Sequence, residues 1–277
     1  MDNVDINVVN DFGMEWSKFD QSSVSEIELK KIFQKYFSIF PWDKLPPNAK
    51  GFDLGCGSGR WAFFVAPKVD KLYCIDPAKD ALEVAQKKLS KYSNCEFHNV
   101  IVDDIPLEDN SMDFGYSLGV LHHIPNTQLG LKICVDKLKP NAPFLLYLYY
   151  ALDNKPLWFR TIWKVSDFFR KFISIMPYPI KYIVTQVIAF IVYLPLARLS
   201  KLLSKFGFDV KNIPLSFYKD KSLYTMRTDA LDRFGTRLEH RFTRKEIEKM
   251  MLNSGLANIE FREEEPFWCA VGYKKEC

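Results

Sequence analysis

The sequence lacks the signatures of several common classes of functional site. Its six cysteines are scattered, at positions 56, 74, 95, 134, 269 and 277, and none forms a CxxC pair or stands beside histidine at zinc-ligand spacing. The phosphate-binding pattern GxxxxGK[ST] is also missing. We therefore expect no metal site and no nucleoside-triphosphate loop.

Two further absences concern location and partners. The first residues, MDNVDINVVND, are acidic and polar, unlike a signal or transit peptide. This predicts a cytoplasmic chain whose cysteines stay reduced. The net charge of +4 is too small to indicate nucleic-acid binding, so no nucleic-acid partner is expected. No pattern indicates an oligomeric state.

A glycine-rich loop is the most informative stretch. Residues 51–60 read GFDLGCGSGR, with Asp53 followed by glycines at 55, 57 and 59. A dinucleotide fingerprint is GxGxxG, and here the third glycine comes one residue early. An acid two residues before the first glycine suits a cationic ligand without a polyphosphate, such as the amino group of a methionine moiety.

Apolar runs alternate with helical patterns around this loop. Strands are predicted at 49–54, 71–76, 95–102, 114–118 and 142–150, with helices at 60–66, 77–89 and 128–138. Such alternation predicts a parallel sheet covered on both faces. Asp76 ends the second strand, 17 residues after Gly59, where an acid commonly binds ribose hydroxyls. We expect its carboxylate to lie near solvent.

Three segments resemble class I S-adenosylmethionine-dependent methyltransferases of the small-molecule type, with a core like methyltransferase domain 11. They are DLGCGSG, the run from Ile105 to the LHH of 121–123, and a C-terminal helix over 243–255 followed by two strands. At Thr243, a capping box with Glu246 is expected. The resemblance implies an α/β, Rossmann-like, doubly wound, mostly parallel seven-stranded sheet with an α-helical cap inserted after the fifth strand. The corresponding segments are an N-terminal arm and helix (1–48), the cofactor-binding core (49–150), the cap (151–239) and the closing helix and strands (240–277).

The resemblance also implies site residues. Family members often carry an acid at the position of Ile101, where it meets the adenine amino group. That acid is missing here, the nearest acids are Asp103 and Asp104, and Asp103 is the one expected to take its place. With S-adenosylmethionine as cofactor, the expected binding residues are Asp53, Gly55, Cys56, Gly57, Gly59, Asp76, Pro77, Asp103 and Leu118.

His122 and His123 are the candidate catalytic residues. They follow the fourth strand, at the edge where open α/β sheets bind ligands. A neutral imidazole there can take a proton from a hydroxyl acceptor. The alternative is that one or both pack structurally, and both readings stay open.

The insertion is basic and apolar at once. Residues 151–221 hold twelve Lys/Arg and four Asp/Glu, a net charge of +8, and 157–172 form a Trp- and Phe-rich amphipathic pattern. Residues 182–197 are uncharged, but sixteen residues fall short of the roughly 18–20 that a spanning helix needs, so we predict no transmembrane span. Three roles stay open: a lid over an apolar acceptor tunnel, peripheral contact of 157–199 with the inner membrane face, and a dimer interface.

The predicted function is methyl transfer to a small or lipid- or sugar-linked acceptor. O-methylation in glycan, lipid or secondary-metabolite biosynthesis is the first choice. C- or N-methylation of a quinone-like aromatic ring is the second, and a non-catalytic cofactor-binding module is the third. Candidate acceptor contacts are Trp16, in a segment that is either a packing arm or a flap over the cofactor, and Tyr224 and Arg227, where the insertion returns to the core.

Overall fold

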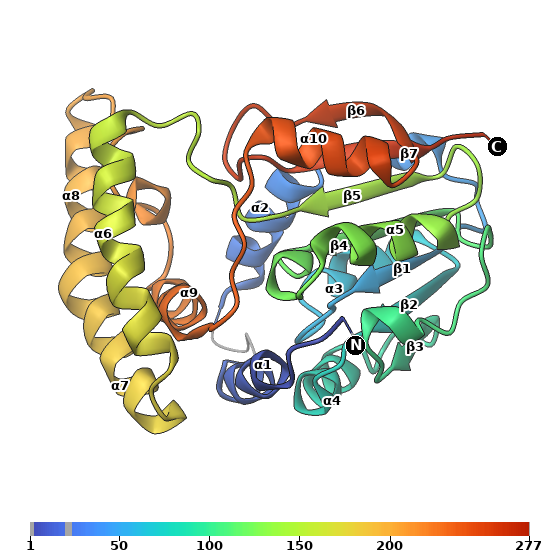
Figure 1. Ribbon diagram of the computed structural model, residues 1–277, viewed down its shortest axis with the longest axis horizontal. Helices are drawn as coiled ribbons and strands as arrows, with labels where there is room; N and C mark the ends of the chain where they lie inside the picture. Colours follow the sequence, from blue (N-terminus) through green and yellow to red (C-terminus); the bar gives the residue numbers. More distant parts are fainter. Residues whose placement is uncertain (1–2, 20–23, 277) are drawn as a thin grey trace. The chain divides into compact units, whose positions relative to one another are not determined.

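The computed structural model describes residues 3–19 and 24–276. The chain forms two compact units. The core unit comprises Met1–Gln21, Leu29–Ala151 and Leu238–Cys277, and the helical unit comprises Ser22–Glu28 and Leu152–Arg237. Figure 1 labels the elements of both.

One seven-stranded sheet builds the core unit, in the order β3-β2-β1-β4-β5-β7-β6. Its neighbours pair in parallel except around β7, which runs antiparallel to β5 and β6. This confirms the doubly wound, mostly parallel α/β sheet. The strands are β1 (Lys50–Leu54), β2 (Lys71–Ile75), β3 (Cys95–His98), β4 (Phe114–Leu118), β5 (Pro143–Tyr147), β6 (Leu256–Phe261) and β7 (Ala270–Lys274).

Paired glycines and phenylalanines hold the two central strands together. Gly51 on β1 pairs with Phe114 on β4, and Phe52 pairs with Gly115. A methyl group on Gly51 would lie 2.3 Å from the Phe114 ring, and one on Gly115 would lie 2.5 Å from the Phe52 ring. Each ring therefore fills the space above a glycine of the neighbouring strand, which fixes how β1 and β4 are aligned at the site.

The core unit has helices on both faces of the sheet, with a buried apolar cluster on each side. Thr243 and Glu246 form the predicted capping box at the start of α10. Helix α1 was not predicted from the sequence. The helices are α1 (Ile6–Lys18), most of α2 (Glu26–Tyr36), α3 (Ala62–Val65), α4 (Lys79–Lys88), α5 (Thr127–Lys137) and α10 (Arg244–Asn253).

Two strands are shorter than predicted. β3 ends at His98, because the Asn99 side-chain amide donates to the carbonyls of Asp76 and Pro77 and draws the chain away from the ladder. β5 ends at Tyr147. The segment after it pairs with the returning chain instead, where the Phe242 N–H donates to the Tyr149 carbonyl at 2.9 Å.

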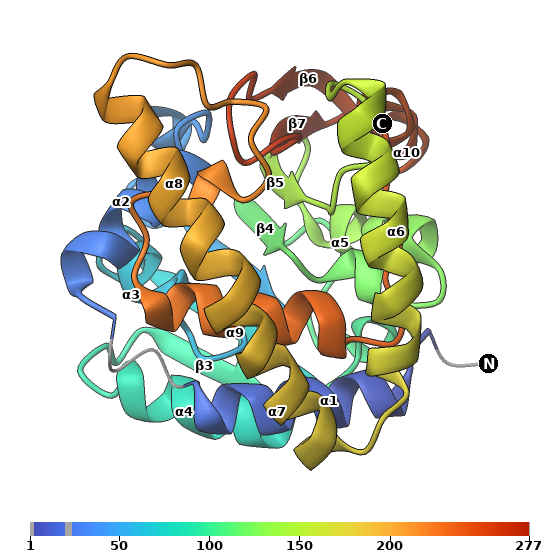
Figure 2. The same ribbon diagram turned by 90° about the vertical axis from the view of Figure 1, so that its left-hand side faces the viewer.

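The helical unit consists of α6 (Leu157–Ser174), α7 (Tyr178–Ile188), a π-helical turn (Ala189–Tyr193), α8 (Leu194–Lys205) and α9 (Leu223–Gly235). α9 packs against α6, α7 and the π-turn, around a small apolar cluster that includes Met226, Ala230 and Phe234. Figure 2 shows α6, α7 and α8 together on one side of this unit.

The uncharged run of the sequence belongs to a longer helix. Residues Tyr178–Lys205 are helical throughout, and this 28-residue helix is long and apolar enough to cross a membrane by length and composition alone. The 16-residue length of the uncharged run therefore does not exclude a spanning helix.

Candidate cofactor and acceptor site

The glycine loop follows β1 in a conformation that requires glycine. Gly55, Gly57 and Gly59 have φ of 76°, 52° and 72°, in the left-handed region that other residues rarely adopt. A methyl group on Gly55 would also lie 2.2 Å from a methyl carbon of Val120. The N–H groups of Gly55 and Cys56 both donate to the Ile75 carbonyl, at 2.7 and 3.1 Å. The loop is therefore fixed against the end of β2.

Asp76 holds the same loop from its side chain. Its Oδ2 accepts the Gly57 N–H at 2.8 Å, and its Oδ1 accepts the Ala78 N–H at 2.9 Å. The residue is buried, 8% exposed, so the prediction that this carboxylate lies near solvent is wrong. Burial raises the pKa of Asp76 to about 6, and the two backbone hydrogen bonds oppose the rise. Asp76 thus positions the loop, and each oxygen keeps a lone pair for a ligand hydroxyl.

Asp53 is buried with one carboxylate oxygen left without a hydrogen bond among the described residues. It lies on β1 with 1% exposure, and its Oδ2 has no hydrogen-bond partner within the described part of the chain. Burial raises the pKa of Asp53 to about 8, while the nearby Tyr116 hydroxyl and Arg60 lower it. A buried carboxyl group of this kind is costly unless a cation or donor joins it. It therefore fits the positively charged methionine portion of S-adenosylmethionine.

Helix α1 covers the glycine loop. The Trp16 indole nitrogen lies 3.2 Å from where a methyl group on Gly57 would be. The Arg60 guanidinium lies 5.3 Å from the Trp16 ring and 4.4 Å from the Trp61 ring. Because α1 also packs along α4, the N-terminal segment is a helix placed over the loop, the position that a flap would take.

Asp103 has an additional task at this end of the sheet. Its Oδ2 accepts the backbone N–H of Asn3 at 2.8 Å, and the Asn3 side chain exchanges hydrogen bonds with the backbone of Asn126. These bonds fasten the segment that precedes α1. A contact of Asp103 with an adenine stays a prediction.

The sheet topology places the other predicted cofactor residues, Leu118, Pro77 and Cys56, near the glycine loop. Leu118 is the buried last residue of β4, and Pro77 directly follows Asp76. Cys56 is buried within the loop as a free thiol. The carboxyl ends of β1, β2 and β4 bring these residues to one edge, because parallel neighbouring strands end on the same side.

His122 lies in the short turn Leu121–His123 that follows β4. Its side chain is fully buried, and neither ring nitrogen has a hydrogen-bond partner among residues 3–19 and 24–276. The ring stacks on Tyr149 at 3.9 Å between centroids. Burial lowers the pKa of His122 well below its usual value, and His123, Arg241 and His240 lower it further. The imidazole is therefore neutral near pH 7, with a free basic nitrogen.

His123 is held differently. Its Nδ1 lies 2.7 Å from the Leu238 carbonyl, to which it donates, and its ring lies 5.0 Å from that of Phe12 on α1. The proton on Nδ1 joins the turn after β4 to the chain that returns at residue 238. Of the two candidate bases, His122 is the one with both ring nitrogens unbonded among the described residues, because Nδ1 of His123 already donates to Leu238.

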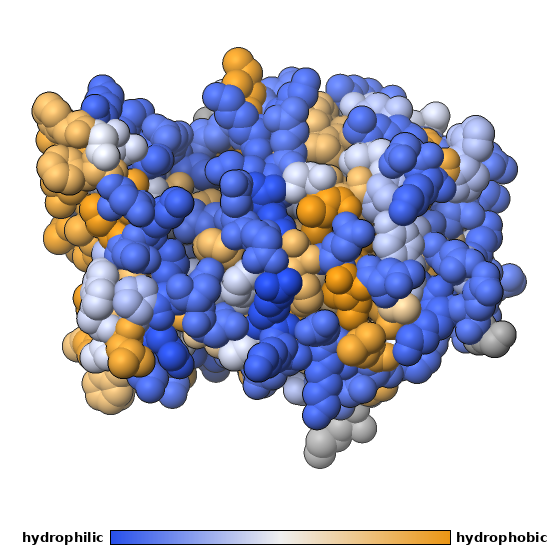
Figure 3. All heavy atoms as spheres, turned by 90° about the horizontal axis from the view of Figure 1, so that it is seen from above, coloured by the Kyte–Doolittle hydropathy of each residue, from blue (hydrophilic) through white to orange (hydrophobic). Residues whose placement is uncertain are grey.

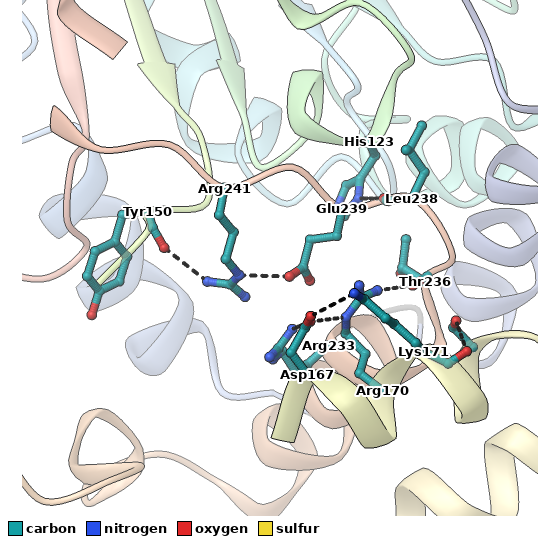
Figure 4. A network of polar contacts seen from close by, with 11 residues as sticks. His123, Tyr150, Asp167, Arg170, Lys171, Arg233, Thr236, Leu238, Glu239 and Arg241 are labelled. Carbon is teal, nitrogen blue, oxygen red and sulfur yellow. Dashed lines mark hydrogen bonds and ion pairs between the residues drawn. The ribbon is translucent and has the colours of Figure 1, made fainter. Parts of the chain in front are cut away.

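A partly buried ion pair near His122 was not predicted. Figure 4 shows the Arg241 side chain extended between Glu239 and Tyr150. It pairs with Glu239 at 2.7 Å, donates to the Tyr150 carbonyl at 3.2 Å, and lies 5.0 Å from the Tyr149 ring. No local pattern signals these residues, because some 90 residues of sequence separate Tyr149 from Arg241 and only the sheet brings them together.

The acceptor residues predicted on the insertion lie in the helical unit, on α9. The Arg227 guanidinium donates to the Gln186 side chain at 2.5 Å and to the Tyr182 hydroxyl at 3.2 Å, which ties α9 to α7. The Tyr224 carbonyl accepts the Thr228 hydroxyl. Roles for Tyr224 and Arg227 toward an acceptor stay predictions.

Residues 115–119, GYSLG, match the GxSxG pattern of a nucleophile elbow. In that motif the serine stands on an exposed turn between a strand and a helix. Ser117 instead lies inside β4, paired with Leu146 of β5, and is fully buried. This serine is therefore no nucleophile elbow.

This sheet order, with a glycine loop after β1 and acids on the ends of β1 and β2, defines a class I S-adenosylmethionine-dependent methyltransferase domain. In agreement, the family model described as "Methyltransferase domain" matches residues 52–141. The chain carries such a domain.

Two curated relatives are similar over this part of the chain. Sterol 4-C-methyltransferase strm-1 of Caenorhabditis elegans is 28% identical over 120 residues, which cover 40% of this chain and 36% of the relative. Demethylmenaquinone methyltransferase of Bacillus licheniformis is 27% identical over 133 residues, covering 46% and 56%. The chain thus matches only about a third to a half of these relatives' lengths.

Solved structures share the fold over nearly the whole chain. One is the complex between the Haloferax volcanii Trm112 methyltransferase activator and a methyltransferase, with a TM-score of 0.52 at 12% identity, covering 96% of this chain and 98% of that chain. Another is a SAM-dependent methyltransferase from Thermotoga maritima, with a TM-score of 0.51 at 12% identity, covering 96% and 100%. At this identity the likeness concerns the fold alone.

Proposed function

We propose that the chain transfers a methyl group from S-adenosylmethionine to a hydroxyl group of an apolar, small or lipid-linked acceptor. The environment of His122 supports a hydroxyl as the acceptor. This buried neutral imidazole lies at the carboxyl end of β4 and has no hydrogen-bond partner among the described residues. A hydroxyl needs a base as it is methylated, and a neutral imidazole is suited to that role.

The cofactor supplies an activated methyl group on a sulfonium, so the protein mainly has to align donor and acceptor. Asp53 would balance the cationic methionine portion, Asp76 would accept from ribose hydroxyls, and the loop of 55–59 would offer backbone N–H groups. His122 would hold the acceptor hydroxyl and take its proton. Its low pKa keeps it unprotonated and ready for this step across the neutral range.

The apolar nature of the acceptor is inferred from two sources. The neighbourhood of His122 is aromatic, with Tyr149 stacked on it and Phe12 near His123. The curated relatives are named for a sterol and for demethylmenaquinone. Those names also support a second candidate function, methylation of a ring carbon in a quinone-like acceptor, for which His122 would position the ring.

Cofactor binding and turnover test the proposal separately. Titration calorimetry with S-adenosylmethionine and with its demethylated product should show binding of both. Radiolabelled methyl groups should then enter the organic-solvent extract of a membrane preparation. If neither compound binds, the chain is not a methyltransferase, and if both bind without transfer to any fraction, the non-catalytic module gains support.

His122→Asn distinguishes oxygen from carbon as the methylated atom. For a hydroxyl acceptor, we expect kcat to fall about 10²- to 10⁴-fold, the usual contribution of a general base. The affinity for the cofactor should stay unchanged. An unchanged kcat with a raised KM would contradict the base and leave His122 a positioning residue.

A further inference from the structure

Helix α6 is placed with its apolar side outward. Its buried positions include Arg170 and Ser174, while Phe168 and Phe172 are more than half exposed. In a soluble protein, the apolar stripe of an amphipathic helix faces the core. The exposed apolar residues of α6 recur every three or four positions, at Leu157, Trp158, Ile162, Val165, Phe168, Phe169 and Phe172.

Charge pairing explains why α6 packs through its polar side. Arg170 pairs with Asp167 at 2.7 Å and donates to the Thr236 carbonyl at 2.9 Å, and Arg233 of α9 approaches Asp167 at 3.7 Å (Figure 4). Burial opposes but does not outweigh the effect of these cations, which lower the pKa of Asp167. The inward side of α6 is thus committed to ion pairs, and its outward side is left apolar.

The helix Tyr178–Lys205 repeats the arrangement. Its buried side is small or polar and includes Thr185, Ala189 and Ser200. Lys181 is also buried there and donates to the Gly235 carbonyl at 3.1 Å. Its exposed large apolar side chains are Ile180, Ile183, Val187, Phe190, Ile191, Val192, Leu199 and Leu202, and the exposed Phe206 directly follows its last residue.

These side chains, together with Ile175 and Phe208, are called here the apolar face, defined as the exposed large apolar residues between Leu157 and Phe208. It holds 18 of the 22 exposed large apolar side chains of the described residues. Both helices contact α9 with their other sides. Figure 2 shows them together on one side of the helical unit, and hydrophobic residues line the left-hand edge of Figure 3. Soluble proteins rarely expose so large a patch without a partner.

The charges around the apolar face identify the partner. Arg160, Lys164, Lys171, Arg198 and Lys205 are exposed on the same helices, and 151–221 carries a net charge of +8. A second copy would bring the same positive charge against this face. A membrane leaflet with anionic lipids instead offers apolar chains beneath negative headgroups, which suits both features at once.

We propose that the apolar face binds the interface of a lipid bilayer that contains anionic lipids, with α6 and α7–α8 lying along the surface. The helix Tyr178–Lys205 lies in the interface and does not span it, because one of its sides is fixed to α9 through the bond of Lys181 to the Gly235 carbonyl and those of Arg227 to Tyr182 and Gln186. The inference does not depend on methyl transfer, because binding to lipid can be measured without cofactor or acceptor.

Co-sedimentation of the full chain with vesicles tests the proposal. Binding is expected to equimolar phosphatidylcholine–phosphatidylglycerol vesicles, to be weaker with phosphatidylcholine alone, and to weaken as salt is added. Absence of binding to the anionic vesicles at low salt would overturn the proposal. Protein that stays with the vesicles at high salt and alkaline pH would overturn the interfacial placement in favour of a spanning helix.

Two matched pairs of variants locate the surface. Phe168→Gln/Ile191→Gln changes two exposed residues of the apolar face, and Leu129→Gln/Leu252→Gln changes two exposed apolar residues of the core unit. The first variant should lose at least about tenfold in vesicle affinity, given the apolar area removed from the lipid. The second should bind like the parent. Equal effects of both variants would overturn the assignment to this face.

The second pair tests charge. Arg160→Glu/Lys164→Glu on α6 and Lys245→Glu/Lys249→Glu on α10 make the same charge change at the same helical spacing, all at exposed positions. Only the first should abolish the preference for anionic vesicles. Analytical ultracentrifugation without lipid completes the test: a dimer that Phe168→Gln/Ile191→Gln dissociates, with no vesicle binding by the parent, would replace the bilayer by a second copy.

Discussion

At the scale of single residues, burial sets the chemistry of the carboxyl groups at the glycine loop. Asp53 and Asp76 both end up inside the core unit, and burial raises the pKa of each, to about 8 and about 6. Asp76 offsets part of that cost with two backbone N–H groups. Asp53 has less compensation, so its environment is ready for a positively charged ligand.

These shifts predict a pH dependence of folding. The pKa of Asp53 rises from 3.8 to about 8 on folding, so the native state holds this proton more tightly than the unfolded state. The stabilising contribution is complete below pH 4 and is lost as pH rises toward 8, at up to ~1.4 kcal/mol per pH unit. Asp76 also makes the folding stability fall as pH rises, up to about pH 6.

Urea unfolding of the parent and of Asp53→Asn, from pH 5 to pH 8, measures the effect. The parent should lose stability across this range, and the variant should lose less because its amide does not titrate. Asp53→Asn should also weaken S-adenosylmethionine binding by tenfold or more, the scale of one charge-assisted contact. Parallel pH profiles of the two proteins would show that Asp53 is not the titrating group.

At the scale of elements, the site is made by strand ends and by the loop between β1 and α3. Its geometry depends on glycine at Gly55 for two reasons, a positive φ and contact with Val120. Gly207 in the helical unit has a similar φ of 83° but open space around it. Alanine substitutions at the two glycines therefore distinguish the stability lost to the backbone conformation from the stability lost to a steric clash.

We predict that Gly55→Ala costs more stability than Gly207→Ala. The φ alone costs roughly 1–2 kcal/mol at either position, and the clash at Gly55 adds about 1–3 kcal/mol and moves the loop. Chemical denaturation gives both values, and calorimetry should show loss of cofactor binding for Gly55→Ala alone. Equal costs with intact binding in both variants would mean that the loop adapts freely.

At the scale of the whole molecule, two units with separate apolar clusters share one chain. Such proteins often unfold in more than one step. We expect two transitions in differential scanning calorimetry, with only the core-unit transition raised by S-adenosylmethionine. At about 100 times the Kd, ligand binding adds roughly 2.7 kcal/mol to the unit that binds it. A single transition that shifts as a whole would indicate that the units fold cooperatively.

The sequence alone predicted most of the core unit. The order of strands and helices, the place of the insertion and the capping box at Thr243 all follow from local patterns: apolar periodicity, glycine spacing and cap residues act over a few neighbouring positions. The glycine loop and Asp76 could be located in the same way, because their spacing along the chain sets their place at the strand ends.

The tertiary structure decided what depends on distant residues. Asp76 is buried because Gly57 and Ala78 close around it, and Arg241 meets Tyr149 only because the chain returns beside β5 after the insertion. The same holds for the insertion. Its amphipathic patterns were visible in the sequence, but which side faces outward was settled when buried charges such as Arg170 and Lys181 found their partners.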